Sequence, residues 1–144
     1  MSRDETVRQL EHEFGVFIRR VRRVIGARAR AVHPDLQPAS YLMLQHLVQT
    51  GPMRSSALAE TFAIDKGAIS RQVQHLTDLG LIVRTPDPVD GRASLLTASA
   101  DAISRLEDVN RIRRKHLGER LGDWSEDDLA AFVAALGRYN TSLE

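Results

Sequence analysis

The sequence contains no cysteine. This absence excludes disulfide bonds, thiolate zinc sites, a cysteine nucleophile and a thiol-based redox switch. It also favours a reducing compartment, so we expect a cytoplasmic protein. A large excess of charge is absent as well, because 20 basic and 19 acidic residues give a formal net charge of +1. Any affinity for nucleic acid must therefore come from a local basic patch rather than from a global field.

The sequence also shows no pattern typical of a secretory signal or a membrane span. The amino end is charged and lacks the apolar stretch of a secretory signal. The longest run without charged residues, 36–53, is interrupted by proline, glycine, histidine and glutamine, so it does not predict a membrane span. With 144 residues and 42% apolar content, the chain is long enough for one domain with a core, and we expect no membrane partner.

Patterns typical of catalysis or metal binding are missing. The five histidines are at least 13 positions apart and form no i, i+4 pair, although ligands from distant segments remain an alternative. Neighbouring acids such as Asp127 and Asp128 face different ways on a helix. The sequence has no phosphate-cradling glycine motif and no nucleophile elbow. We therefore expect no catalytic residues, no metal and no cofactor.

The apolar periodicity predicts six helices. A stripe from Leu10 to Ile25 indicates a long first helix over about 4–30. Pro38 opens a second helix that ends at Gly51. A short third helix, 57–62, is expected to be capped by Ser55 or Ser56. The fourth should run over 66–79, with Asp65 as its N-cap and Gly80 after its last turn.

Two short apolar segments follow, 81–85 and 93–96, separated by a turn that contains an Asp-Gly pair. They predict a β-hairpin. Thr97 or Ser99 is expected to cap a long fifth helix, and Ser125 begins the sixth with a capping-box-like pattern. The expected fold class is mainly α with a small β-hairpin wing.

Two short helices joined by a tight turn and followed at once by a hairpin form the order of a winged helix-turn-helix. Opposite its apolar face, the fourth helix presents groups that can donate to phosphates and base edges in the major groove. Taken alone, this face could equally be the solvated side of a surface helix, but its context favours DNA binding. The candidate DNA-binding residues are Ser55, Lys66, Ser70, Arg71, Gln74, Arg84, Asp90 and Arg92.

The hairpin turn has its own prediction. Asp90 and Gly91 make a tight turn, and Arg92 projects from it as a single cation of the kind that a minor groove attracts. A bare carboxylate is unfavourable near phosphates. We therefore expect Asp90 to order the wing by accepting hydrogen bonds from the loop or from a neighbouring arginine. An ordinary hairpin turn with a surface arginine is the alternative.

Four segments together resemble the MarR family of bacterial transcriptional regulators: Leu58–Glu60, Ile69–Val73, Leu76–Ile82 and Asp87–Thr97. The resemblance implies a homodimer with dimerisation helices at about 4–30 and 98–144 and a DNA-binding lobe at about 36–97. It further implies binding to double-stranded DNA at a pseudo-palindromic operator, and repression that a small aromatic or anionic effector relieves. Gln37 and Ala100 depart from the family pattern, which puts only local helix capping in doubt.

The apolar stripes of the terminal helices support dimerisation independently, since a small winged module cannot cover them within one subunit. The first helix also carries six arginines between residues 19 and 30, with no acid between Glu13 and Asp35. These arginines could be solvated or pair with the acids of 123–128 across the dimer, contact DNA phosphates, or receive an anionic effector. The alternative function is a winged-helix protein-interaction module without specific DNA binding.

Overall fold

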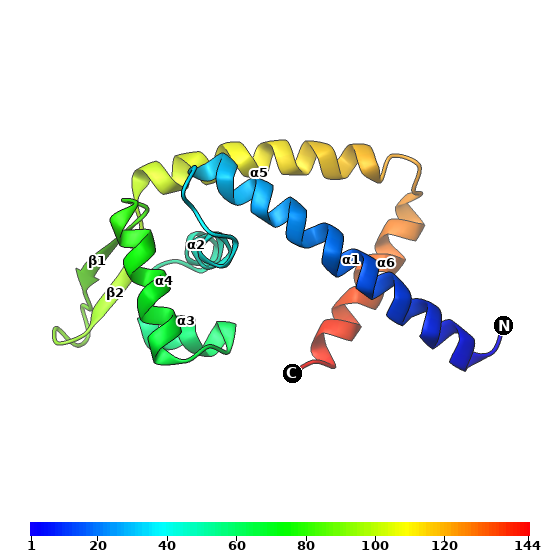
Figure 1. Ribbon diagram of the computed structural model, residues 1–144, viewed down its shortest axis with the longest axis horizontal. Helices are drawn as coiled ribbons and strands as arrows, with labels where there is room; N and C mark the ends of the chain where they lie inside the picture. Colours follow the sequence, from blue (N-terminus) through cyan, green and yellow to red (C-terminus); the bar gives the residue numbers. More distant parts are fainter. The chain divides into compact units, whose positions relative to one another are not determined.

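The computed structural model describes all 144 residues. It contains six helices and one two-stranded antiparallel hairpin in the order α1, α2, α3, α4, β1, β2, α5, α6, as Figure 1 shows. The chain divides into two compact units, 1–109 and 110–144, and the boundary falls inside α5 (Ala100–Arg120). The predicted fold class, mainly α with a hairpin wing, is confirmed.

Helix α1 spans Arg3–Val32, close to the predicted range. Ser2 and Glu5 form a reciprocal capping box at its start, and the hydrogen bonds from Ser2 lower the pKa of Glu5. At its other end, the Arg105 guanidinium of α5 donates to the carbonyl of Val32 at 2.9 Å, which satisfies one of the open carbonyls there. Only the last two turns of α1 contribute buried residues.

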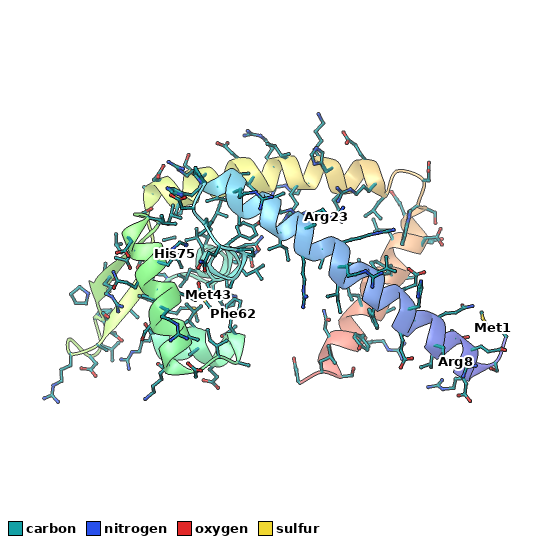
Figure 2. The ribbon with its side chains drawn as sticks, in the orientation of Figure 1. Met1, Arg8, Arg23, Met43, Phe62 and His75 are labelled. Atoms are coloured by element: carbon teal, nitrogen blue, oxygen red, sulfur yellow. The ribbon has the colours of Figure 1, made fainter.

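The lobe that follows α1 has its own core. It contains α2 (Pro38–Thr50), α3 (Ser55–Phe62), α4 (Lys66–Asp78) and the hairpin, and α2 packs against α1, α4 and β2. Figure 2 shows Met43 and Phe62 among the side chains that gather between its helices. The largest fully buried side chains of the lobe come from all of these elements: Tyr41, Leu44, Leu47, Leu58, Val73, Leu76, Leu81, Ile82 and Leu96.

Most predicted helix ends are confirmed, but the cap of α3 is not. Pro38 lies in the first turn of α2, and Gln37 makes no side-chain cap there. The N-cap of α3 is Arg54, also without a side-chain cap bond, so the expected cap by Ser55 or Ser56 is wrong. The pairing of Met53 with Leu96 of the hairpin ends at Arg54, so α3 begins at Ser55, two residues earlier than predicted, and both serines lie inside its first turn.

The hairpin pairs β1 (Ile82–Pro86) with β2 (Ser94–Ala98), with Ile82 opposite Ala98 and Pro86 opposite Ser94. Before β1, Gly80 has φ of 71°, which a residue without a Cβ adopts at little cost. This agrees with the predicted end of α4.

Helix α5 spans Ala100–Arg120, and its predicted cap is Ser99, which accepts the Ala102 amide at 3.1 Å. Helix α6 spans Glu126–Thr141, and Ser125 caps it as predicted. In contrast to the lobe, α6 has no buried residue. No helix of the chain combines the length and the apolar content needed to cross a membrane.

Candidate nucleic-acid interface

Helix α4 has one buried face and one exposed face. Ile69, Val73 and Leu76 are buried in the lobe, because their spacing places them on one side of the helix. The side chains on the other side are exposed, and they include every residue of α4 proposed from the sequence: Lys66, Ser70, Arg71 and Gln74. The structure therefore brings these four candidates onto one accessible surface of a rigid helix.

The start of α4 is held by its N-cap. Asp65 accepts the Ala68 amide at 2.7 Å, as the sequence predicts. A Cβ built at Gly67 would lie 3.3 Å from a terminal nitrogen of Arg71 and 3.3 Å from the Asp65 carboxylate. Gly67 therefore leaves room for the Arg71 guanidinium to lie along the first turn. One turn further on, the Gln74 amide donates to Asp78 at 2.7 Å, which orients its carbonyl and its second N–H.

The wing presents two exposed cations. Arg84 lies in the middle of β1 opposite Leu96, and Arg92 lies in the turn. The backbone amide of Arg92 donates to the Asp90 carboxylate at 3.1 Å, and the Ala93 amide donates to the Asp90 carbonyl at 3.0 Å. Asp90 therefore orders its own turn through local backbone bonds.

A neighbouring arginine is held by a different acid, Asp87, which sequence reasoning missed. The Nε and Nη2 atoms of Arg54 donate to one Asp87 oxygen at 2.8 and 2.6 Å, and the Val89 amide donates to the other oxygen at 2.9 Å. Of the two partners expected for Asp90, the loop and an arginine, Asp90 binds the loop, and Asp87 holds the arginine. Asp87 is 8% exposed, and the Val89 amide and then the Arg54 guanidinium lower its pKa below the ordinary range.

The Arg54–Asp87 pair connects the base of the wing to the start of α3. Beside it, Met53 and Leu96 exchange two backbone hydrogen bonds, at 3.2 and 2.8 Å. The segment before α3 thus acts as a short third strand of the wing. These contacts fix the wing relative to the helices of the lobe, which a DNA reader needs if helix and wing are to engage one site together.

Ser55 differs from the other candidates in its burial. It is the first residue of α3 and is half-buried, with Arg54 at the N-cap position before it. Its amide belongs to the first turn of α3, whose N–H groups have no partner within the helix. Such amides can donate to a phosphate oxygen. The role of Ser55 in DNA binding stays a prediction.

The structure contains no group of three or more histidine, cysteine, aspartate or glutamate side chains placed to hold a metal ion. The histidines lie in separate elements, and Figure 2 places His75 on α4 within the lobe. The ionic chemistry available at this surface is therefore that of arginine, lysine and hydrogen-bonding side chains.

Comparison with known proteins identifies the chain. The MarR family model matches residues 35–93, which include α2, α3, α4, the first strand of the hairpin and its turn. An HTH-type transcriptional regulator of Bacillus subtilis (strain 168), YxaD, is 34% identical over 140 residues, covering 97% of this chain and 96% of that protein. The chain belongs to the MarR family.

Solved structures agree with this assignment. A probable transcriptional regulator from Pseudomonas aeruginosa is 27% identical and superposes with a TM-score of 0.64, covering 90% of this chain and 98% of that one. A MarR family protein from Bacillus stearothermophilus has a TM-score of 0.77 at 18% identity, covering 99% of both chains, which shows the shared fold. This MarR-family chain is thus a winged-helix transcriptional regulator and not an enzyme.

Proposed function

We propose that this MarR-family regulator binds a pseudo-palindromic operator as a homodimer and represses transcription until a small ligand releases it. The observation that carries the proposal is the exposed face of α4, where Lys66, Ser70, Arg71 and Gln74 lie together beside a wing fixed by the Arg54–Asp87 pair. The buried face of α4 leaves this surface free to enter a major groove.

Each candidate residue has a distinct role in this proposal. Arg71 pairs with the O6 and N7 acceptors of guanine, and Gln74 pairs with adenine. Ser70 donates to a base edge or phosphate. Arg92 enters the minor groove, while Asp90 orders the turn that presents it. Lys66, Arg84 and the Ser55 amide contact phosphates and position the lobe without reading sequence.

Apolar surface outside the lobe supports the proposed homodimer. Leu129, Phe132, Val133 and Leu136 of α6 are 37 to 62% exposed. In residues 7–18 of α1, the exposed apolar side chains, 45 to 60% exposed, are Val7, Leu10, Phe17 and Ile18. A second copy covers such faces most simply, and two-fold symmetry then places two α4 helices on half-sites about 10 bp apart.

The proposed effector is a small aromatic or anionic molecule. The Tyr41 hydroxyl in α2 is buried without a hydrogen-bond partner, and buried polar groups normally have one. A polar ligand that reaches this hydroxyl would bind the lobe and could favour a dimer geometry in which the α4 helices no longer match the groove spacing. Melting-temperature shifts with a panel of small carboxylic acids and phenols test this step, and the Tyr41→Phe variant should lose the shift.

Selection of genomic fragments with the purified protein at physiological salt, followed by footprinting, tests the operator. We expect a protected pseudo-palindrome that covers about two helical turns. Reporter expression from the selected promoter should rise when the regulator is deleted. Protection of a single half-site would overturn the homodimeric operator, and a fall in expression would overturn repression.

A further inference from the structure

Two buried polar residues, Ser40 and Asp87, each join two elements of the lobe. Asp87 is 8% exposed and fixes the wing to the start of α3 through Arg54. Ser40 lies in α2 and is 0% exposed, and its hydroxyl donates to the Oε1 atom of Gln72, a half-buried residue of α4. The buried hydroxyl thus joins α2 to the helix that carries the candidate base-reading side chains.

The other buried residues of α2 and α4 are hydrophobic, and the two helices pack against one another. Hydrophobic contacts have no preferred direction, so they alone allow α4 to roll about its own axis at little cost. A hydrogen bond has a narrow range of length and angle. One side-chain hydrogen bond joins α2 to α4, between Ser40 and Gln72, and it is therefore the contact that can fix this roll.

Gln72 lies at the edge of the buried face of α4, formed by Ile69, Val73 and Leu76. At 3.6 residues per turn, Gln72 is about 70° from the centre of that face, whereas Arg71 is about 170° away, in the middle of the exposed face. A roll of about 10° would carry a side-chain end, about 5–6 Å from the axis, through about 1 Å. Because a binding side chain must be held within about 0.5 Å, a roll of this size would misplace Arg71.

We infer that Ser40 and Gln72 are positioning residues for sequence readout, because their hydrogen bond fixes the roll of α4 on α2 and so directs Arg71 and Gln74 to the base edges. The inference rests on the operator binding proposed above and adds to it two residues that act without touching a base. Contacts to phosphates carry no sequence information, and a flexible side chain such as Lys66 follows a small shift. Loss of the bond should therefore weaken binding to the operator more than binding to an unrelated duplex.

Three variants remove the bond in different ways. Ser40→Ala removes the donor, and the half-buried Gln72 amide can then bind water. Gln72→Met removes the acceptor at similar length and leaves the buried Ser40 hydroxyl without it, so this variant should have the lowest melting temperature. The double variant Ser40→Ala/Gln72→Met replaces both partners by apolar groups of similar shape, which can be nearly neutral for stability. Its melting temperature should return to within about 2 °C of the unmodified protein.

Fluorescence anisotropy with the footprinted operator and a scrambled duplex measures the effect on readout. In all three variants the operator Kd should rise about tenfold, the size of one lost base contact, while the Kd for the scrambled duplex stays within about twofold. The two single changes should not add, because each removes the same contact. The double variant is decisive, since its stability returns while its preference for the operator does not.

Thr77→Val is the matched control. The Thr77 hydroxyl donates to the Val73 carbonyl of the same helix at 2.8 Å, so its bond lies on α4 but does not reach α2. Valine keeps the shape of the side chain and removes this bond. We expect both duplex affinities of Thr77→Val to stay within about twofold of the unmodified protein.

Recovery of operator affinity together with the melting temperature in the double variant would overturn the inference and assign the bond to stability alone. Equal losses on the operator and the scrambled duplex would also overturn it, because the roll of α4 should act on base contacts. Both outcomes leave the proposed function intact. An unmodified protein that does not distinguish the operator from the scrambled duplex would instead overturn the proposed function, and this inference with it.

Discussion

Helices α4 and α6 have the same kind of N-cap, but their apolar stripes differ in burial. Each has a side-chain N-cap, Asp65 in one and Ser125 in the other, and each carries an apolar stripe. In α4 the stripe residues are at most 3% exposed, whereas the four stripe residues of α6 are 37 to 62% exposed. Local sequence thus forms both helices, but only the stripe of α4 is buried in a core. In the proposed function, α4 reads DNA and the stripe of α6 joins two copies.

The largest expected effect is on the free energy of unfolding, and it should differ between the stripes of α4 and α6. Leu76→Ala leaves a cavity in a fully buried site and should lower the free energy of unfolding by about 2–5 kcal/mol. Leu136→Ala on α6 should instead act through the proposed dimer, so its effect on the melting temperature should be small below the dimer Kd and should grow as the protein concentration rises above it. Thermal unfolding over a hundredfold range of concentration measures both. Equal, concentration-independent losses would show that α6 is covered within one chain.

The next effect concerns the exposed side of α4. Arg71→Ala should weaken operator binding by about 1–3 kcal/mol and relax the preference at one base position in each half-site. The matched control is Arg23→Ala on α1, which removes an arginine outside the candidate interface. Fluorescence anisotropy with the footprinted operator and a scrambled duplex measures both affinities. An equal loss on the two duplexes would assign Arg71 to a phosphate rather than a base.

The same contrast shows how far the sequence leads. Periodicity and caps identify α4, its N-cap Asp65 and its exposed candidates, because all of these depend on neighbours within four residues. The Arg54–Asp87 pair joins residues 33 positions apart, and only the path of the hairpin brings them together. The start of α3 also depends on a distant segment, because Met53 pairs with Leu96 of the hairpin just before the helix begins at Ser55.

Loss of an N-cap should have a smaller effect on stability. The same substitution can be made in both helices, because each is capped by a side-chain oxygen. Asp65→Ala and Ser125→Ala each remove an acceptor for one first-turn amide, at 2.7 and 3.1 Å respectively. Each should cost about 0.5–2 kcal/mol of helix stability. Hydrogen exchange should show faster exchange of the first-turn amides in the altered helix alone. Faster exchange across the whole lobe in Ser125→Ala would contradict the separation of the two regions.

The smallest expected effect is a local change in the wing at acid pH. Because the folded state lowers the pKa of Asp87, the carboxylate contributes stability above its unfolded pKa, near 3.8, and loses it as the pH falls through the lower folded value. Protonation should then release the Val89 amide and the Arg54 guanidinium. NMR should show the Val89 amide shift moving below about pH 4, together with a low carboxyl pKa for Asp87.

The Asp87→Asn variant serves as the comparison for this titration, since it removes the charge at neutral pH and keeps the shape of the side chain. Its Val89 amide shift at pH 7 should approach that of the unmodified protein at acid pH, and its operator affinity should fall by less than that of Arg71→Ala. The α6 amides belong to the other compact unit of the chain, and we expect them to show the same shifts in both proteins. A Val89 shift that follows the titration in the variant as well would show that the acid transition does not belong to Asp87.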